Sequence, residues 1–439
     1  MSGATLQSST LTDRSIFAGR EVLAGRRRGL RAFLPFAGPA LIASVAYMDP
    51  GNFATNIQGG ARFGYMLLWV VVAANLTAML FQALSARLGI VAGRSLAALC
   101  RERFPRPLVL LMWAASEVAA MATDLAESLG AAVGLNLLFG MPLLEGLLAT
   151  FAVTYAVLLL ERRGFRPMEL LIGGFVAMIG LSYLIELFIA PPDWHAVAYH
   201  AVMPHLAGPE SMTLAVGVIG ATVMPHAIYL HSSLMQGRMP AMNDAERRRI
   251  LGFSNREVLL ALGIAGLVNM AMMAMAAVMF HDGHADVAGI ETAYRTLLPL
   301  MGGGAAGVFM VSLLASGLSS SVVGTMAGQA IMQDFVGYRI PLWLRRTLTM
   351  APALVVVGLG VGATDALVLS QVVLSLVLPM PMLALLKLTA NREVMGAFVT
   401  GPRMRIAAYL ATLLVLALNV VLVMQTIGLD VPVFGHPGT

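Results

Sequence analysis

Long runs of apolar residues dominate the pattern along the chain, and short polar connections separate them. A helix that crosses a membrane needs about 20 mostly apolar residues. Eleven such runs are present, and we expect each to form a spanning helix. They cover residues 34–57, 66–86, 108–137, 143–160, 168–190, 212–236, 257–281, 304–333, 341–361, 365–388 and 404–428. The pattern therefore predicts an all-α integral membrane protein with eleven transmembrane helices.

The composition agrees with this pattern. Apolar residues make up 58% of the 439 positions and charged residues only 12%, with a mean hydropathy of +0.81. A soluble domain carries about 25% charged residues, so the bilayer must be the solvent for most of this chain. The lone Cys100 excludes an intramolecular disulfide and a cluster of cysteine ligands. Residues 1–32 lack a signal peptide, and we expect them to form a disordered cytoplasmic tail.

The basic residues lie on one side of the predicted membrane. Six arginines in the tail and twenty basic residues in the even-numbered connections place 26 of the 28 on the side of the N-terminus. Only Arg62 and Arg295 fall on the other side. Because positive charge is retained inside, we expect a multi-pass protein of the cell (plasma or inner) membrane with its N-terminus cytoplasmic and its C-terminus external. This bias accounts for the pI of about 9.6 without any nucleic acid.

A short element recurs five spans apart. AYMDPGN (residues 46–52) lies in the first run and ATVMPH (residues 221–226) in the sixth, and aligning their prolines places Asp49 opposite Met224. Each proline removes a backbone hydrogen bond and breaks its helix. Interrupted helices at matching positions of two inverted halves indicate a transporter's midplane site. We therefore expect an inverted 5+5 repeat with broken helices 1 and 6, over 33–190 and 210–390, and an eleventh helix at 402–429.

The residues at these breaks suit a metal ion. A carboxylate inside a membrane span is costly and indicates function, and Asp49 is followed by the amide oxygen of Asn52. Met224 offers a thioether, and the carbonyl groups of Ala46 and Ala221 are candidates to complete the site. Calcium and magnesium prefer all-oxygen sites, whereas manganese, iron, cobalt and cadmium accept sulfur. The set predicts binding of a divalent transition metal, although Met224 could instead fill the core.

The third run carries three acidic residues. Glu117 and Asp124 are seven residues apart and nearly eclipsed, and Glu127 is displaced by about 60°. Carboxylates along one stripe of a membrane helix predict a proton path. Arg345 and Arg346, at the start of the ninth run, are either partners of these acids or interfacial anchors.

Other polar residues also lie in the runs. His226 and His231 are about 140° apart around a helix, so we do not expect them to share a metal ion. His226 is a candidate proton acceptor or gate residue, and both histidines could instead be structural. Gln371 could lend its amide oxygen to the ion in one conformation. Glu169 and Glu186 lie close to span ends and are expected to reach water.

Together these segments resemble the Nramp family, the natural resistance-associated macrophage protein transporters, from about residue 33 to 428. The resemblance rests on DPGN (49–52), MATDLAE (121–127), MPH (224–226) and GLSSSVVGTMAGQ (317–329). The last of these is rich in small and hydroxyl residues, which by itself indicates close helix packing.

The resemblance implies a leucine-transporter-type fold that works by alternating access and imports Mn²⁺ or Fe²⁺ with protons, often accepting Co²⁺, Cd²⁺ and Zn²⁺. The bacterial manganese importers are the favoured type. It implies metal ligands at Asp49, Asn52, Met224, Ala46 and Ala221, with Gln371 joining in one conformation. It implies a proton path through Asp124, Glu127 and Glu117, with His226, His231, Arg345 and Arg346 as further candidates. We expect no resident cofactor and no obligate protein partner.

Three other functions are less consistent with these residues. A cation-coupled amino-acid carrier of the same fold would bind its substrate's carboxylate through backbone N–H groups, and Asp49 would repel that group. A channel usually builds its filter from rings of subunits. An intramembrane metalloprotease needs two histidines four apart with a glutamate beside the first, and the sequence has no such motif. We therefore expect a transporter and not an enzyme.

Overall fold

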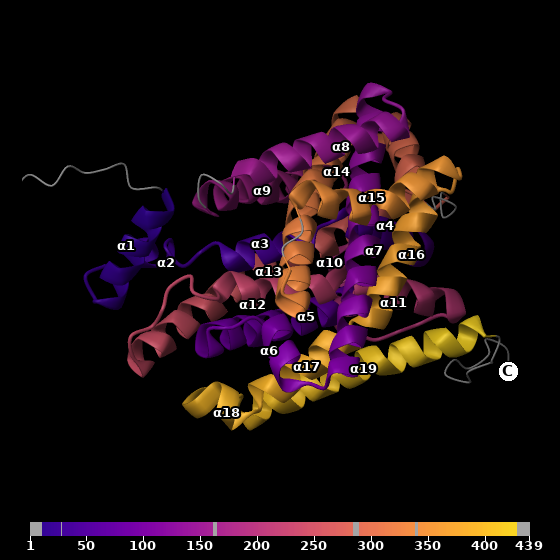
Figure 1. The fold of residues 1–439 in the computed structure, drawn as a ribbon. Helices are drawn as coiled ribbons and strands as arrows, with labels where there is room; N and C mark the ends of the chain where they lie inside the picture. Colours follow the sequence, from indigo (N-terminus) through magenta and orange to yellow (C-terminus); the bar gives the residue numbers. More distant parts are fainter. Residues whose placement is uncertain (1–10, 28, 161–164, 284–288, 339–340, 428–439) are drawn as a thin grey trace, which may run out of the picture.

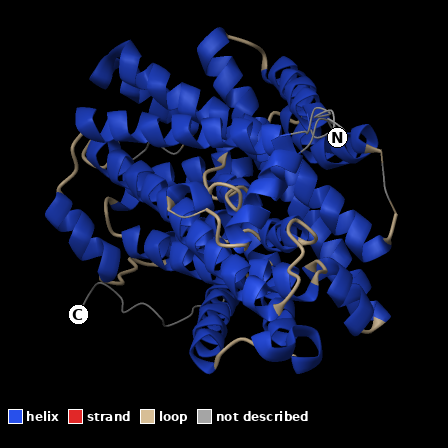
Figure 2. Cartoon of the chain, turned by 90° about the vertical axis from the view of Figure 1, so that its left-hand side faces the viewer, coloured by secondary structure: helices blue, strands red, loops and turns tan. Residues whose placement is uncertain are grey.

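A computed structural model describes residues 11–27, 29–160, 165–283, 289–338 and 341–427 of the chain. This part consists of helices and their connections and contains no strand (Figure 2). Residues 1–10 of the predicted tail and residues 428–429 of the last predicted segment lie outside the described residues.

The helices follow one another with short connections. The first half of the chain forms α1 (Leu11–Leu23), α2 (Leu30–Phe33), α3 (Pro39–Val45), α4 (Pro50–Phe63), α5 (Leu68–Ala92), α6 (Leu96–Arg103), α7 (Arg106–Phe139), α8 (Leu143–Leu158), α9 (Phe165–Ile189) and α10 (Trp194–Val202). The second half forms α11 (Pro209–Thr222), α12 (Pro225–Met235), α13 (Asp244–Phe280), α14 (Ile290–Val336), α15 (Leu342–Gly358), α16 (Ala363–Val377), α17 (Pro379–Thr389), α18 (Arg392–Met395), a short 3-10 helix (Gly396–Phe398) and α19 (Pro402–Thr426).

Eight stretches of the described chain are helical, long and apolar enough to cross a membrane. They are Leu68–Ala92, Arg106–Phe139, Arg166–Ile189, Pro209–Met235, Asp244–Phe280, Gly302–Val336, Ala363–Thr389 and Pro402–Met424. The other three predicted runs hold shorter helices: the pair α3 and α4, the 16-residue α8, and the 17-residue α15. The helical content and these spans confirm the predicted all-α membrane protein.

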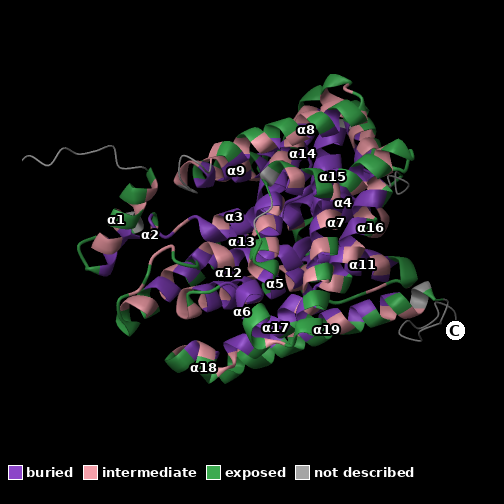
Figure 3. Ribbon diagram, in the orientation of Figure 1, coloured by how far each residue is buried: buried purple, intermediate pink, exposed green. Residues whose placement is uncertain are grey.

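The long helices form one bundle (Figure 1). Helices α5, α9, α13 and α19 run in similar directions, and α7 crosses them steeply while packing against α14, α16, α8 and α15. Helix α1 lies at one end of the bundle, and α19 ends at the other. Buried residues fill the interior, and exposed ones follow the outer faces (Figure 3). Many of these exposed residues are large and apolar, such as Phe188 and Leu413, as expected of a surface that faces lipid.

Two helices break where the sequence predicted. Helix α3 ends at Val45 and α4 begins at Pro50, while α11 ends at Thr222 and α12 begins at Pro225. These positions confirm the expectation of broken helices 1 and 6. In the tenth predicted span α16 passes into α17 at Leu378, before a proline, but Leu378 keeps helical backbone angles and the span is not unwound there.

The N-terminal tail differs from the prediction of disorder, because residues 11–23 form α1. Val22 and Leu23 are buried in a small apolar cluster that includes Ile250 of α13. Arg20 forms an ion pair with Glu246 at 3.3 Å. The predicted disorder is therefore wrong for this segment, since its apolar side is covered by a helix more than 200 residues further along the chain.

Candidate functional site

The first helix break presents a buried carboxylate. Asp49 is the N-cap of α4, and its Oδ1 accepts hydrogen bonds from the backbone N–H of Asn52 at 2.8 Å and from the Asn52 side chain at 2.7 Å. Aspartate is a favoured N-cap, and Pro50 is well placed in the first turn because it has no N–H to satisfy. Within the described residues, Asp49 Oδ2 has no hydrogen-bond partner, and neither Asp49 nor Asn52 is exposed.

The second break lies against the first. The Asn52 side chain donates to the carbonyl oxygen of Ala221 at 3.0 Å, and Thr222 donates to Asn52 Oδ1 at 3.3 Å. Met224 is the N-cap of α12 but makes no capping hydrogen bond through its side chain, and it is fully buried. Asn52 therefore joins the two breaks, as the sequence motifs suggested.

The prolines also explain which carbonyl groups are free. In an α-helix the carbonyl of residue i accepts from the N–H of residue i+4. The residues four positions after Ala46 and Ala221 are Pro50 and Pro225, which have no N–H to donate. Both carbonyl groups thus lose their helical partner, and Ala221 accepts from Asn52 instead.

Gln371 of α16 lies beside both breaks. A Cβ atom at Gly51 would come within 2.1 Å of the Gln371 side chain, and one at Gly220 within 2.0 Å of its backbone oxygen. The approach at Gly220 is to backbone, so only glycine permits it. Gln371 Nε2 donates to Ser370 at 3.0 Å, whereas its Oε1 has no partner in the described part of the chain. The structure therefore places an amide oxygen that lacks a hydrogen-bond partner among the described residues next to the start of α4.

These groups form an unusual donor set. Nowhere among the described residues do three or more histidine, cysteine, aspartate or glutamate side chains gather in a way that could hold a metal ion. The breaks instead combine one carboxylate, two amides, backbone carbonyl groups and a thioether. Such a mixture of hard oxygen and soft sulfur can coordinate a transition metal.

Two arginines of α15 contact the acidic stripe of α7. Arg345 forms an ion pair with Glu117, and Arg346 forms one with Asp124. Arg346 is fully buried and also donates to Thr325 at 3.2 Å, to Ser128 at 3.3 Å and to Ser321. Both arginines are thus partners of the acids, and not interfacial anchors.

Asp124 and Glu127 lie on the same helix but have different surroundings. Both oxygens of Asp124 are occupied, one by Arg346 and the other by Thr349, which donates at 2.5 Å. Both oxygens of the buried Glu127 lack a partner in the described structure. The Glu127 carboxyl group lies against Gly324 of α14, where a Cβ atom would come within 2.4 Å of it.

The two histidines of α12 contact different helices, in agreement with the predicted angle between them. His226 Nδ1 is 3.0 Å from the hydroxyl of Thr123 on α7. His231 Nδ1 is 2.8 Å from the amide oxygen of Gln82 on α5, and Gln82 in turn donates to the Tyr47 hydroxyl at 2.6 Å. Each histidine keeps an Nε2 without a partner among the described residues.

The small-residue stretch of α14 does more than pack closely. Ser321 and Thr325 bind Arg346, Gly324 contacts Glu127, and Ser316, directly before the stretch, donates to the carbonyl oxygen of Met48 at 2.5 Å. Asn269 of α13 donates to the neighbouring carbonyl of Tyr47 at 2.7 Å. The sequence predicted only close packing for Ser321, Gly324 and Thr325 and no role for Ser316 or Asn269, because their partners lie on distant helices.

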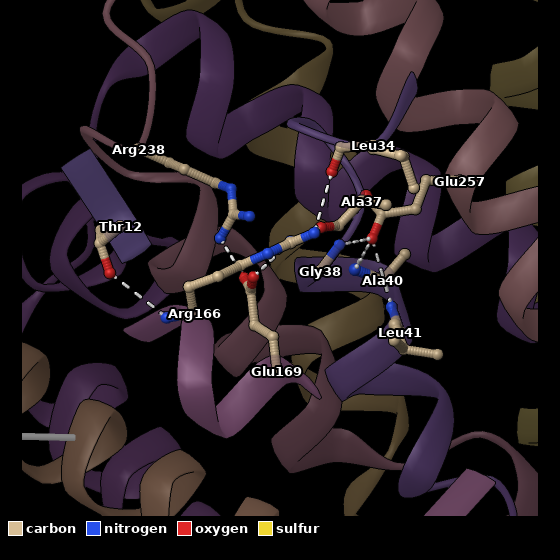
Figure 4. Close-up of polar contacts among 10 residues, drawn as sticks. All are labelled: Thr12, Leu34, Ala37, Gly38, Ala40, Leu41, Arg166, Glu169, Arg238 and Glu257. Carbon is tan, nitrogen blue, oxygen red and sulfur yellow. Dashed lines mark hydrogen bonds and ion pairs between the residues drawn. The ribbon is translucent and has the colours of Figure 1, made fainter. Parts of the chain in front are cut away.

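A further polar cluster fixes the start of α3 (Figure 4). Glu257 of α13 accepts hydrogen bonds from the backbone N–H groups of Gly38 at 2.5 Å, Ala40 at 3.0 Å and Leu41 at 3.3 Å. A carboxylate at a helix N-terminus is favourable because it satisfies free N–H groups. This cap was not predicted.

Glu169 belongs to the same cluster and does not reach water as expected. It is buried between Arg166, at 2.8 Å, and Arg238. Arg166 also donates to the carbonyl oxygen of Ala37 at 2.6 Å. Two guanidinium groups offset the cost of burying this carboxylate. Glu186 is buried as well, so the prediction for both residues is wrong.

Comparison with known proteins agrees with this arrangement. The family model of natural resistance-associated macrophage protein-like proteins (Nramp) matches residues 40–425. A divalent metal cation transporter MntH of Verminephrobacter eiseniae is 63% identical over 99% of this chain and 98% of its own. The MntH of Deinococcus radiodurans is 54% identical over 91% and 92% of the two chains.

Solved structures of membrane transporters are also similar to this chain. The manganese transporter of Eremococcus coleocola superimposes with a TM-score of 0.83 at 32% identity, covering 94% of this chain and 91% of that one. Mhp1, a nucleobase-cation-symport-1 family transporter, shares only the fold, with a TM-score of 0.52 at 12% identity over 91% and 94% of the two chains. The chain therefore belongs to the Nramp family of membrane transporters.

Proposed function

We propose that this protein imports divalent transition-metal ions, with manganese as the leading substrate, in symport with protons and by alternating access. The observation that carries the proposal is the joining of two helix breaks by Asn52, beside an oxygen of Asp49 that has no partner among the described residues. The names of the relatives, divalent metal cation transporter and manganese transporter, support the same substrate class. Membership of a transporter family agrees with the expectation that the chain is not an enzyme.

In this proposal the metal is bound where α3 meets α4 and α11 meets α12. Asp49 supplies negative charge, Asn52 and the carbonyl groups of Ala46 and Ala221 supply neutral oxygens, and Met224 supplies sulfur. Gln371 adds its amide oxygen in one conformation. The thioether would disfavour calcium and magnesium relative to manganese, iron, cobalt and cadmium.

Protons would move along α7. Glu127 is the first acceptor in this scheme, because its carboxyl group is buried and its oxygens are unpartnered within the described residues. Asp124 with Arg346, and then Glu117 with Arg345, continue the path toward the start of α7. His226 tunes the step from its contact with Thr123, and His231 takes part through Gln82.

Alternating access requires that the site open to one side at a time. Asp49, Asn52 and Met224 have no exposed surface, so the site must open for an ion to enter or leave it. The Glu257 and Glu169 cluster holds the start of α3 at the end of the bundle that carries α1. Release of this cluster would free α3 to move. We assign this end to the cytoplasm on the basis of its arginines.

The proposal is tested by Mn²⁺ uptake into proteoliposomes with an acid-outside pH gradient and excess Ca²⁺ and Mg²⁺. We expect uptake that acidifies the lumen, resists the competing ions and is lost in Asp49→Ala. Asp365→Ala, which removes an exposed carboxylate at the start of α16, should transport as the unaltered protein does. Absence of uptake by the folded protein would overturn the proposal and favour an amino-acid carrier of this fold.

A further inference from the structure

A large open cavity lies between the N-terminal helices and α13, and none of its lining residues belongs to the helix breaks. Its volume is about 1130 Å³, and it is lined by residues of α1, of α2, of the connection between them and of the first turns of α13. These helices meet at the end of the bundle that carries the N-terminus (Figure 1). The transport scheme gives this cavity no role.

Among the described residues, four arginines and no acidic residue line the cavity. They are Arg27, Arg248, Arg249 and Arg256. Arg27 pairs with Glu21 at 2.5 Å, but the other three have no carboxylate within 4.0 Å in the described part of the chain. Arg249 donates to the backbone carbonyl of Leu23 at 2.9 Å, which orients its guanidinium group between α13 and α1. Arg248, Arg249 and Arg256 therefore bring positive charge to the cavity that no described carboxylate neutralises.

The rest of the lining is mainly apolar. Phe33 of α2 and Phe253 of α13 contribute to it, together with Leu259 and Leu260. These two leucines are 61% and 56% exposed, and Leu267, two turns further along the same helix, is 67% exposed. Large exposed leucines on a membrane helix mark a face that is in contact with acyl chains.

The charged and apolar parts follow one another along a single face of α13. Residues 249, 253, 256 and 260 are spaced by four, three and four and lie within about 60° around the helix. Arg256 and Leu260 are separated by about 6 Å along the helix axis. The change from charge to apolar surface thus occurs inside the cavity, as it does between the phosphate and the acyl chains of a lipid.

We propose that this cavity binds an anionic glycerophospholipid. Arg248, Arg249 and Arg256 bind its phosphate headgroup, and the acyl chains follow Leu259 and Leu260 into the bilayer. Basic pockets between membrane helices on the cytoplasmic side are suited to such headgroups. Arginines that only anchor a helix at the membrane surface can reach any lipid phosphate without a cavity. Here α1 and α2 close one side of the cavity, which favours a specific lipid site over general anchoring. The lipid would bridge α1 to α13, beside the ion pair of Arg20 with Glu246.

The experiment measures lipid retention and does not depend on transport. The purified full chain is titrated with phosphatidylglycerol, phosphatidylcholine or inorganic phosphate in detergent, and bound lipid is counted by native mass spectrometry. The test variant is Arg248→Gln/Arg249→Gln/Arg256→Gln. The matched control, Arg392→Gln/Arg403→Gln/Arg405→Gln, removes the same charge from exposed positions of α18 and α19 at the same end of the bundle.

We expect the unaltered protein and the control to prefer phosphatidylglycerol, and the test variant to bind it about a hundredfold more weakly. Equal retention by test and control variants would overturn the site, since it would indicate a general arginine belt. Binding of inorganic phosphate as tightly as phosphatidylglycerol would also overturn it, because the apolar part would then contribute nothing.

A second variant distinguishes loss of the lipid site from loss of folding. Gly252 lines the cavity, and outside its own helix no described atom lies within 4 Å of the place where its Cβ would be. Gly252→Trp therefore places a bulky side chain in the cavity, between the arginines and the leucines, while retaining every arginine. We expect it to lose phosphatidylglycerol while unfolding at the same temperature as the unaltered protein. Unchanged lipid binding in this folded variant would overturn the proposal.

Discussion

Two buried polar regions of this protein differ in how completely the oxygens of their central aspartates, Asp124 and Asp49, are paired. Where α7 meets α15, Arg346 and Thr349 occupy both oxygens of Asp124. At the helix breaks, one oxygen of Asp49 and the amide oxygen of Gln371 have no partner in the described structure. Buried polar atoms are normally hydrogen-bonded. The free oxygens of Asp49 and Gln371 are therefore available to a ligand, whereas the two oxygens of Asp124 are already used by the protein.

Glu127 lies between these two regions and resembles the breaks. It is one turn from Asp124 on α7, yet neither of its oxygens has a partner among the described residues. Close spacing on one helix thus predicts a shared face but not a shared environment. We therefore propose that the proton passes between Glu127, whose oxygens have no partner among the described residues, and Asp124, whose oxygens are both paired.

The largest loss of stability is expected at Asp124, whose two oxygens are both paired. Arg346→Gln leaves Asp124 buried without its countercharge, which should cost about 3–5 kcal/mol of stability. Arg345→Gln should cost less, because its partner Glu117 is 18% exposed. Thermal unfolding in detergent measures both. The double variant Asp124→Asn/Arg346→Gln should recover part of the loss, and equal destabilisation by the two arginine variants would contradict the comparison.

At the breaks, charge and capping can be separated. Asp49→Asn retains an N-cap acceptor for the Asn52 N–H but removes the charge, whereas Asp49→Ala removes both. Stability should be unchanged in the first variant and lower by about 1 kcal/mol in the second. Both should weaken Mn²⁺ binding by about a hundredfold or more, since loss of an outer-shell partner alone costs about 10–100-fold. Calorimetric titration measures the affinity, and intact binding by Asp49→Asn would remove Asp49 from the ligands.

The two acids of α7 should respond differently to neutralisation. Glu127→Gln breaks no ion pair and should leave stability unchanged, whereas Asp124→Asn leaves Arg346 buried with its charge unpaired. Both should suppress proton flux, while equilibrium metal binding stays within about threefold because neither residue is a proposed ligand. Proton flux into liposomes and metal titration are measured on each variant. If a variant lost metal binding but kept its proton flux, the altered acid would belong to the metal site and not to the proton path.

The parts of this site that the sequence predicted depend on local chemistry. A proline breaks its own helix, so Pro50 and Pro225 could be placed without knowledge of any neighbour. Three acids at helical spacing predict one stripe. The same prolines also determine which carbonyl groups lose their donors, those of Ala46 and Ala221.

The parts that could not be predicted depend on distant partners. Arg345 and Arg346 could have been anchors or partners, and only their position against α7 distinguishes these roles. Glu169 is buried because Arg238 reaches it from 69 residues away, which no periodicity indicates. Helix α1 forms against Ile250 for the same reason.

The smallest expected effect tests the soft ligand at the breaks. Met224→Leu conserves volume and should change stability by less than about 1.5 kcal/mol, but it removes the only sulfur proposed for the site. Mn²⁺ binding should weaken only moderately, while its preference over Ca²⁺ should fall by about tenfold, because calcium gains little from a thioether. Met212→Leu, a buried substitution near the start of α11, should leave selectivity unchanged. If both variants discriminate as the unaltered protein does, selectivity must come from the geometry of the oxygen ligands and not from sulfur.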